Sequence, residues 1–420
     1  MERQLSSTGQ NIAVIGGGIV GLCIALKLQL SGENVTVFDK RGAGEGCSKG
    51  NAGHFATEQV FPLATPALLP QLPKMLLSSN SPVSIRFQDI HKTLGWMIQF
   101  LSKARKKPTE HATSALTNLN QHAMSSWYQL LEKVNLSHLI VMDGSLLTFE
   151  SDESFKAYSE TLYQLEKQGV SYEVWGQKLI QLRVPNLSHT VKHGVFFSET
   201  GHSLNPYNIC LEMKFAFERL GGEWRKEQVE NVMLNNGAEL ITDGRHRRFD
   251  KVIVATGAES SPLIKRITGI KVPLQAERGY HLMLPDLADS LPFPVSSADR
   301  KFIMTPMQGG LRLAGTVEYA DLESPPNMKR AEMLKRLAKG LLSDDCKLEN
   351  SGEKWMGNRP SLPDSLPVID SYSQGKVLFA FGHQHLGLTQ AAVTADIVSQ
   401  LHYEQKPAID ISPFQLSRFG

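Results

Sequence analysis

The sequence has few cysteines, no long apolar run and no excess of one charge, and each shortage argues against a class of protein. Four cysteines occur in 420 residues, without a CxxC pair or a histidine at metal-ligand spacing, so we expect no disulfide framework and no metal site. The formal net charge is +2. The densest basic run, residues 245–248, follows an Asp-Gly turn pair, and therefore no nucleic-acid partner is expected.

The apolar stretch at residues 12–26 is shorter than a membrane span and contains glycines at fixed offsets. No small-residue cleavage site follows it. We therefore interpret it as a buried strand and helix, and expect a cytoplasmic protein. With 41% hydrophobic and 20% charged residues, the composition is that of a soluble globular protein, and the length favours two domains.

Residues 11–40, NIAVIGGGIVGLCIALKLQLSGENVTVFDK, have the pattern of a strand, a glycine turn, an apolar helix and a second strand. Gly16, Gly18 and Gly21 form a GxGxxG motif at the first turn, and Asp39 ends the second strand. Such glycines allow a tight turn, the approach of a pyrophosphate and close helix packing, while the acid accepts from ribose hydroxyls. The sequence thus predicts a dinucleotide site, and this motif alone leaves FAD and NAD open.

Three further small-residue loops lie far apart in the chain: GCSKGNAG (46–53), VIVATGA (252–258) and FGHQHLGLTQ (381–390). Together they indicate one long ligand that runs through the domain. Residues 232–258 predict a β-meander, with turns at Asn236-Gly237 and Asp243-Gly244, that leads into a buried strand.

With these loops, the chain resembles the FAD-dependent amine and amino-acid oxidoreductases of the D-amino-acid oxidase group, in particular the glycine oxidase and D-amino-acid dehydrogenase branch. The resemblance covers essentially the whole chain. It implies an α/β fold in which a discontinuous Rossmann-like FAD-binding domain carries an inserted α+β substrate domain, built on a mostly antiparallel sheet. The predicted FAD-binding domain comprises residues 1–61, 190–272 and 350–420, and the substrate-binding domain comprises residues 62–189 and 273–349.

The resemblance implies non-covalent FAD, because Gly357 and Asn358 stand where some members of the wider group attach the flavin through a cysteine. The glycine motif would take the pyrophosphate. The loop that opens the last helix would face the flavin pyrimidine ring, where a helix N-terminus stabilises the negative charge of reduced flavin. The expected cofactor-binding residues are Gly16, Gly18, Ile19, Val20, Gly21, Asp39, Lys40, Ser48, Asn51, Ala52, Gly53, Val229, Thr256, Gly257, Gly382, Leu386, Gly387, Leu388 and Thr389.

The segment GNRPSLPD (357–364) places Arg359 next to prolines, which predicts a stiff, extended backbone. In the family this arginine binds the substrate carboxylate, so that the substrate Cα–H can point at flavin N5. The alternative is a salt bridge to an acid such as Asp364 or Asp370 that only fixes the strand.

The expected catalytic residues are Arg359, Tyr280, His383 and His54. The substrate amine must lose a proton, either to solvent or to a nearby base, and His383, His385 and His54 are the candidates. For each histidine, a structural hydrogen bond is an equal alternative. Tyr280, in ERGYHLM, is expected to form a wall of the substrate pocket.

The predicted function is that of an FAD-dependent D-amino-acid dehydrogenase that passes a hydride from Cα to flavin N5 and electrons to a quinone or another acceptor. The segment GNAGHFATEQVFPLATP (50–66) resembles the branch that acts on cyclic imino acids such as D-proline and cis-4-hydroxy-D-proline. The alternatives are an amino-acid oxidase that uses dioxygen, like glycine or sarcosine oxidase, a non-catalytic flavin-binding subunit, and an NAD-dependent dehydrogenase. The oligomeric state stays open.

Residues 94–107, LGWMIQFLSKARKK, combine apolar residues at helical spacing with cations at the end. An interfacial helix has this pattern, and peripheral contact with the inner face of the membrane is one interpretation. The other is an ordinary domain helix whose cations favour its C-terminal dipole.

Overall fold

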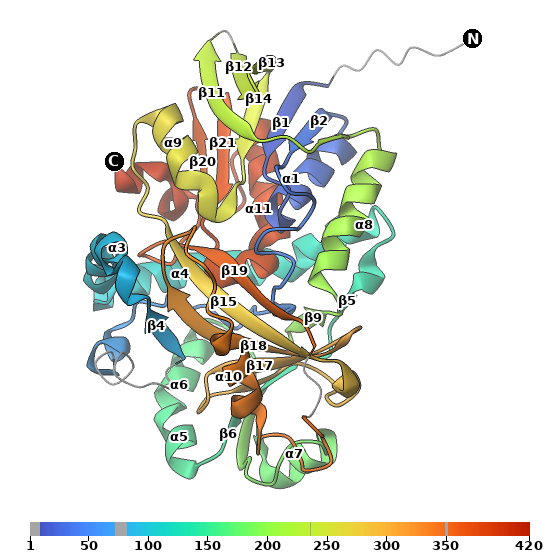
Figure 1. The fold of residues 1–420 in the computed structure, drawn as a ribbon, viewed down its shortest axis with the longest axis vertical. Coiled ribbons are helices and arrows are strands. Elements are labelled where there is room, and N and C mark those ends of the chain that lie inside the picture. The colour runs from blue at the N-terminus through green and yellow to red at the C-terminus, as the bar shows by residue number, and fades with distance from the viewer. Residues whose placement is uncertain (1–8, 72–81, 236, 349–351) are drawn as a thin grey trace.

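The computed structural model describes residues 9–71, 82–235, 237–348 and 352–420. One of the two parts of the molecule is built on a six-stranded sheet with the order β10-β2-β1-β14-β21-β20 (Figure 1). Segments from the whole length of the chain contribute to this sheet. Neighbouring strands are parallel except for β20, which runs antiparallel to β21. The strands are β1 (Asn11–Ile15), β2 (Asn34–Phe38), β10 (Glu223–Arg225), β14 (Lys251–Val254), β20 (Val368–Tyr372) and β21 (Val377–Phe381).

Both faces of this sheet are covered, because its central strands are apolar on both sides. One face packs against helices α1 (Ile19–Leu30), α8 (Pro206–Arg219) and α11 (Gly387–His402). The other face packs against α9 (Ser260–Thr268) and the predicted meander, which consists of β11 (Val229–Asn235), β12 (Gly237–Thr242) and β13 (Arg245–Phe249). Asn236 of the first predicted turn lies outside the described residues.

The second half is built on a larger sheet with the order β19-β15-β18-β17-β16-β6-β8-β7, and β4 also pairs with β18. All pairs are antiparallel except β16–β6 and β18–β4, which confirms the mostly antiparallel second sheet. Its strands are β4 (Val83–Ile85), β6 (Ser145–Phe149), β7 (Glu173–Gly176), β8 (His193–Phe197), β15 (Gln275–Leu284), β16 (Val295–Ser297), β17 (Phe302–Met307), β18 (Gly310–Tyr319) and β19 (Lys354–Ser361).

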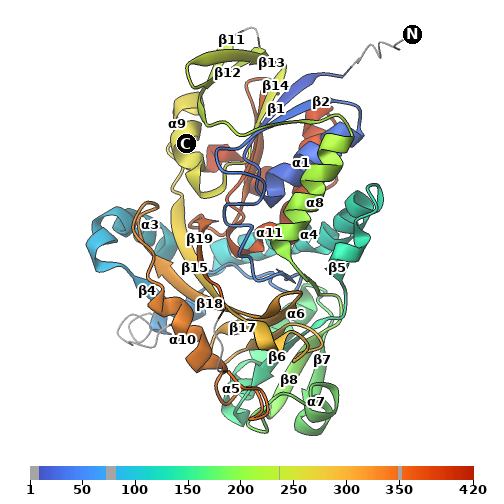
Figure 2. The ribbon, with the colours of Figure 1, turned by 45° about the vertical axis from the view of Figure 1, so that its right-hand side comes forward.

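Two strands of this sheet lie in ranges that the sequence analysis assigned to the cofactor-binding domain. β8 pairs with β6 and β7, and β19 pairs along its whole length with β15, so both join the larger sheet. The two halves meet at β15 and β19 (Figure 2). The domain boundaries stay a prediction, and the one at residue 350 falls outside the described residues.

Helices surround the larger sheet. α10 packs against β15 and β18, and the aromatic rings of Trp96 and Phe100, on α3, stack 5.0 Å apart beside Tyr319 of β18. Among the described residues, no helix has the length and apolar character needed to cross a membrane. These helices are α3 (Ile90–Lys103), α5 (Asp152–Ala157), α6 (Ser159–Lys167), α7 (Gln177–Arg183) and α10 (Lys329–Ala338). The long helix α4 (Lys106–Glu132) instead packs against α11.

Short elements complete the fold. A small antiparallel sheet contains β3 (His54–Phe55), β5 (Ile140–Val141) and β9 (Gly201–Ser203). Single 3-10 turns are η1 (Pro66–Gln71), η2 (Phe87–Asp89), η3 (Ser137–Leu139), η4 (Gly257–Glu259), η5 (Pro285–Leu287), η6 (Gln384–Leu386), η7 (Ser412–Phe414) and η8 (Leu416–Phe419).

Candidate active site

A cavity of about 800 Å³ opens at the carboxyl ends of β1, β2, β14 and β21 and continues to β19. Ligands of open α/β sheets bind at this edge. Most of the predicted cofactor-binding residues line it, namely Gly16, Gly18, Ile19, Val20, Asp39, Lys40, Ser48, Asn51, Val229, Thr256, Gly257, Gly382, Gly387 and Leu388. The predicted residues outside the lining are Gly21, Ala52, Gly53, Leu386 and Thr389.

The glycine turn has the shape that a pyrophosphate requires. Gly16 has φ +107°, a conformation that favours glycine. A side chain at Gly18 would point into open space, since only the Ser48 hydroxyl oxygen lies within 4 Å of the added carbon, at 3.4 Å. A side chain at Gly21 would meet the Gly16 carbonyl oxygen at 1.9 Å, so this glycine allows α1 to pack on β1. Gly18 is thus the position where backbone can approach a phosphate.

Asp39 lies at the end of β2 inside the cavity, and backbone donors fix its carboxylate. The Gly17 N–H donates to Oδ2, and the Arg41 and Gly42 N–H groups donate to Oδ1. Ser48 accepts a hydrogen bond from the backbone N–H of Ile19, at the start of α1. The residues expected at the adenosine and phosphate end are therefore held at one edge of the sheet.

The loop before α11 forms the other end of the cavity. His383 is buried and its Nε2 lies 3.0 Å from the Thr394 hydroxyl, while burial lowers the pKa of His383 to about 3. A neutral histidine with a hydrogen-bonding partner is the state that this environment favours. Thr389 accepts from the Ala56 N–H, which ties the start of α11 to the strand segment after residue 53.

Arg359 lies on β19 directly opposite Glu277 of β15. The Arg359 Nη1 donates to Glu277 Oε1 over 3.2 Å, and the guanidinium lies next to Gly279, where an added side chain would meet Arg359 Cζ at 2.5 Å. The cavity lining includes residues from both faces of β19, namely Trp355, Met356, Gly357, Asn358 and Pro360, whereas Arg359 itself is outside the lining. Arg359 therefore sits on a paired strand beside the cofactor cavity.

Glu277 is the partner that the sequence analysis missed. The acids it considered are engaged elsewhere: Asp364 pairs with Arg418 at 2.9 Å, and Asp370 accepts from the Leu416 N–H. The only sequence signal for Glu277 is its position in a β-rich stretch, because the contact joins residues 82 positions apart.

Tyr280 lies in β15, three residues after Glu277. Alternate residues of a strand point to opposite faces, so Tyr280 lies on the face of β15 away from Glu277 and Arg359. Its hydroxyl donates to Glu318 over 2.6 Å, and its ring is almost fully buried. This side chain belongs to a buried polar network on the α10 side, and its place in a wall of the substrate pocket stays a prediction.

Two further candidate histidines have different surroundings: His54 is paired with Glu58, and His385 lies near Arg359 and Glu277. His54 is buried, with Nε2 3.0 Å from Glu58 Oε1 and Nδ1 3.2 Å from the Gly201 carbonyl oxygen. His385 lies close enough to Arg359 and Glu277 for their charges to act on it, although burial is the main cause that lowers its pKa. Across the described ranges, no group of three or more His, Cys, Asp or Glu residues could hold a metal ion.

The sheet order, the glycine turn and the cavity at the strand ends define a dinucleotide-binding α/β protein with a second, antiparallel sheet at the far end of the ligand site. The family model described as DAO, FAD dependent oxidoreductase, matches residues 11–401, and the chain belongs to this family. FAD is accordingly its cofactor, and the open space at Gly18 and the cavity volume of about 800 Å³ fit a dinucleotide.

Among curated proteins, the chain is 30% identical over 426 residues to a D-amino-acid oxidase of Bradyrhizobium diazoefficiens, covering 98% of this chain and 99% of the relative. It is 26% identical over 424 residues to a D-amino acid dehydrogenase of Sinorhizobium medicae, covering 97% of this chain and 100% of the relative.

Two solved structures share the fold. Glycine oxidase from Geobacillus kaustophilus has a TM-score of 0.74 at 19% identity, covering 97% of this chain and 99% of that one. L-Proline dehydrogenase from P. horikoshii has a TM-score of 0.74 at 18% identity, covering 98% of both. At these identities the likeness establishes the α/β fold of the family and no more.

Proposed function

We propose that the protein oxidises a D-amino acid or a cyclic imino acid, such as D-proline or cis-4-hydroxy-D-proline, at its Cα–N bond and passes the electrons to a quinone or another acceptor. The observation that carries the proposal is Arg359, a partly buried guanidinium on a paired strand beside the cofactor cavity. Two relatives named for D-amino acids support the substrate class. Bound FAD supplies the acceptor for the hydride.

In this proposal each residue of the site has a separate task. Arg359 binds the substrate carboxylate, and its strand pairing fixes the direction in which Cα points. His385, whose pKa burial lowers, is neutral near pH 7 and can accept the proton that the amine loses; His54 or solvent is the alternative. His383, buried beside Thr394, orders the loop rather than exchanging protons.

The first test is the visible absorbance spectrum of the purified protein without oxygen, before and after D-proline, cis-4-hydroxy-D-proline, D-alanine and glycine. Loss of the oxidised-flavin band with one of them supports the proposal, and the relative rates choose between cyclic and acyclic substrates. A flavin band that none of them bleaches contradicts the substrate assignment and favours a non-catalytic flavin-binding subunit. Mixing the reduced protein with dioxygen or with a soluble quinone then separates an oxidase from a dehydrogenase.

Arg359→Ala tests the carboxylate contact. A desolvated charge-assisted clamp contributes roughly 3 kcal/mol, so KM should rise about 100-fold while the FAD content stays unchanged. Arg300→Ala is the matched control, because Arg300 is a similarly half-buried arginine of the same half of the molecule, paired with Glu150. Equal kinetics of Arg359→Ala and the wild type would refute the contact.

Within the same function, we propose that α3 lies on an anionic membrane surface at the inner face of the cytoplasmic membrane. Trp96 and Phe100 are buried, whereas four apolar side chains of η2 and α3, spaced three or four residues apart, are exposed and form an apolar stripe. Its members are Phe87 (83% exposed), Ile90 (44%), Leu94 (54%) and Ile98 (61%). Exposed cations at residues 105–107 follow the helix and complement anionic lipid.

The same helix is connected to the cofactor cavity. Lys92 of α3 pairs with Asp321 at 2.9 Å, and the next residues, Leu322 and Glu323, line the cavity. A membrane-bound α3 would therefore bring the cavity close to a quinone dissolved in the lipid.

Flotation with vesicles of phosphatidylglycerol and phosphatidylcholine tests this surface. We expect the wild type to float with the anionic vesicles, and the double variant Leu94→Gln, Ile98→Gln to stay at the bottom. Leu182→Gln is the control, because Leu182 is 77% exposed on α7 and lies outside the stripe. A wild-type protein that stays at the bottom contradicts the membrane contact.

A further inference from the structure

Glu277 is a buried carboxylate beside Arg359, and among the described residues only one of its two oxygens has a hydrogen-bond partner. Its side chain is 3% exposed, and Oε1 accepts from Arg359 Nη1. Oε2 is buried and has no hydrogen-bond partner within the described ranges. Buried carboxylate oxygens normally accept at least one hydrogen bond, so an acceptor without a donor at a ligand site indicates a donor supplied by the ligand.

Several described side chains lie near Glu277, and none of them donates a hydrogen bond to Oε2. Across the sheet its register neighbours are Arg359 on β19 and Tyr319 on β18. Tyr319 is itself buried against Trp96, and burial raises its pKa well above the ordinary value, with the Glu277 charge adding to the effect. His385 approaches from the loop before α11. None of these side chains donates a hydrogen bond to Oε2 in the described part of the chain.

The charge balance of the pair selects a particular kind of ligand. Arg359 and Glu277 together are neutral. A carboxylate that binds Arg359 would leave one uncompensated negative charge in a mostly buried place, which is costly. A ligand that brings a carboxylate and an amino group keeps the site neutral. Because the two groups share one carbon, the amino nitrogen of a ligand on Arg359 lies within reach of a carboxylate that touches the same guanidinium.

We propose that Glu277 Oε2 accepts a hydrogen bond from the substrate amino group. Arg359 then binds the carboxylate and Glu277 the amine of the same zwitterionic substrate. This rests on the proposed function. Glu277 is then a specificity-determining residue: it favours amino and imino acids and rejects carboxylates that lack the amine. Primary and cyclic secondary amines both carry an N–H, so both satisfy this contact.

The test compares ligands that differ only in the amine. D-Alanine is matched with propanoate, and D-proline with cyclopentanecarboxylate. Apparent dissociation constants come from flavin reduction without oxygen for the amino acids and from competition for the carboxylates. In Glu277→Gln we expect the amino acids to bind about 10-fold more weakly or worse and the carboxylates to bind several-fold more tightly, since a buried like charge has been removed. Glu150→Gln, which removes the carboxylate of the Arg300 pair, should change neither.

Opposite shifts for the two ligand classes support the proposal. A parallel loss for both classes would mean that Glu277 only positions Arg359, and unchanged constants would mean that it contacts nothing; either result overturns the proposal. If Glu277→Gln does not fold, Glu277→Asp keeps the charge and should keep the preference for amino acids over matched carboxylates, and loss of that preference overturns it. Failure of the proposed function would show separately, as a wild-type flavin that no amino acid reduces.

Discussion

Gly18 and Gly21 are three positions apart in one turn, yet a side chain would have a different consequence at each. At Gly18 an added carbon would enter the cofactor cavity, and at Gly21 it would collide with the Gly16 carbonyl. Gly18→Ala should therefore weaken FAD binding at least about 10-fold and leave the stability of the FAD-free protein unchanged. Gly21→Ala should lower that stability by about 2 kcal/mol, because α1 must move away from β1.

Titration with FAD and urea unfolding of the FAD-free protein measure the two effects independently. Gly176→Ala is the control, since no atom lies within 4 Å of the added carbon. Equal losses of FAD affinity and of stability in both variants would show that the two glycines do not have separate roles.

At this scale the sequence predicts what is local and misses what depends on register. The glycine motif and Asp39 lie within one βαβ unit, so their spacing alone locates the cofactor site. Glu277 acquires its meaning from a strand 82 residues away. For Tyr280 the sequence predicts a place on a strand, but alternation along β15 does not state which parity faces the ligand.

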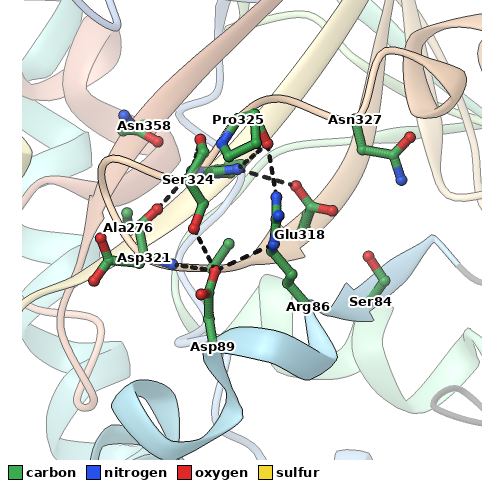
Figure 3. A network of polar contacts seen from close by, with 12 residues as sticks. Ser84, Arg86, Asp89, Ala276, Glu318, Asp321, Ser324, Pro325, Asn327 and Asn358 are labelled. Carbon is green, nitrogen blue, oxygen red and sulfur yellow. Dashed lines mark hydrogen bonds and ion pairs between the residues drawn. The ribbon is translucent and has the colours of Figure 1, made fainter.

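A buried polar network fixes the loop at residues 321–327 (Figure 3). Arg278 is fully buried, pairs with Glu318, and donates to the carbonyl oxygens of Asp321, Ser324 and Pro325. From the opposite side, Asp89 accepts from the Asp321 N–H over 3.0 Å and from the Ser324 hydroxyl over 2.6 Å. Leu322 and Glu323, between these anchors, line the cavity.

Loss of the Asp89 contacts to this loop should therefore make FAD dissociate faster. Asp89→Ala leaves two donors of the loop unpaired, which costs about 1–3 kcal/mol of local stability. We expect the rate of FAD release to rise about 10-fold and KM to stay near the wild-type value, because Arg359 and Glu277 are untouched. Asp410→Ala is the control. Asp410 also accepts from a backbone N–H and a hydroxyl, both of Ser412, but neither residue belongs to the loop at residues 321–327 or lines the cavity. An unchanged release rate contradicts the role of the anchor.

At the scale of elements, the apolar pattern predicts helices and strands better than it predicts their partners. Residues 94–107 were expected to be helical, and α3 ends within them. The pattern did not show that Trp96 and Phe100 pack inward while Leu94 and Ile98 face solvent, because both faces of this helix are apolar. The pairing of β19 with β15 was likewise missed, since residues after 350 were grouped with the six-stranded sheet by their position in the chain.

At the scale of the whole molecule, buried histidines make the folded state sensitive to acid. Burial lowers the pKa of His202 to about 4 and the pKa values of His281 and His383 to about 3. In the unfolded chain these groups titrate near 6.5, so below that pH the unfolded state binds more protons. Their contribution to stability is therefore complete above about pH 6.5 and is lost as the pH falls toward the folded pKa values.

Each such histidine should remove up to roughly 2 kcal/mol between pH 6.5 and 5, at about 1.4 kcal/mol per pH unit. The urea midpoint of the FAD-loaded protein should accordingly fall over this range, and His202→Gln should reduce the fall, because an amide does not titrate. His202 suits the test since it is buried and lies outside the cavity lining. His189→Gln, at an exposed histidine, should follow the wild type. If His202→Gln loses as much stability as the wild type, His202 does not contribute to the acid sensitivity.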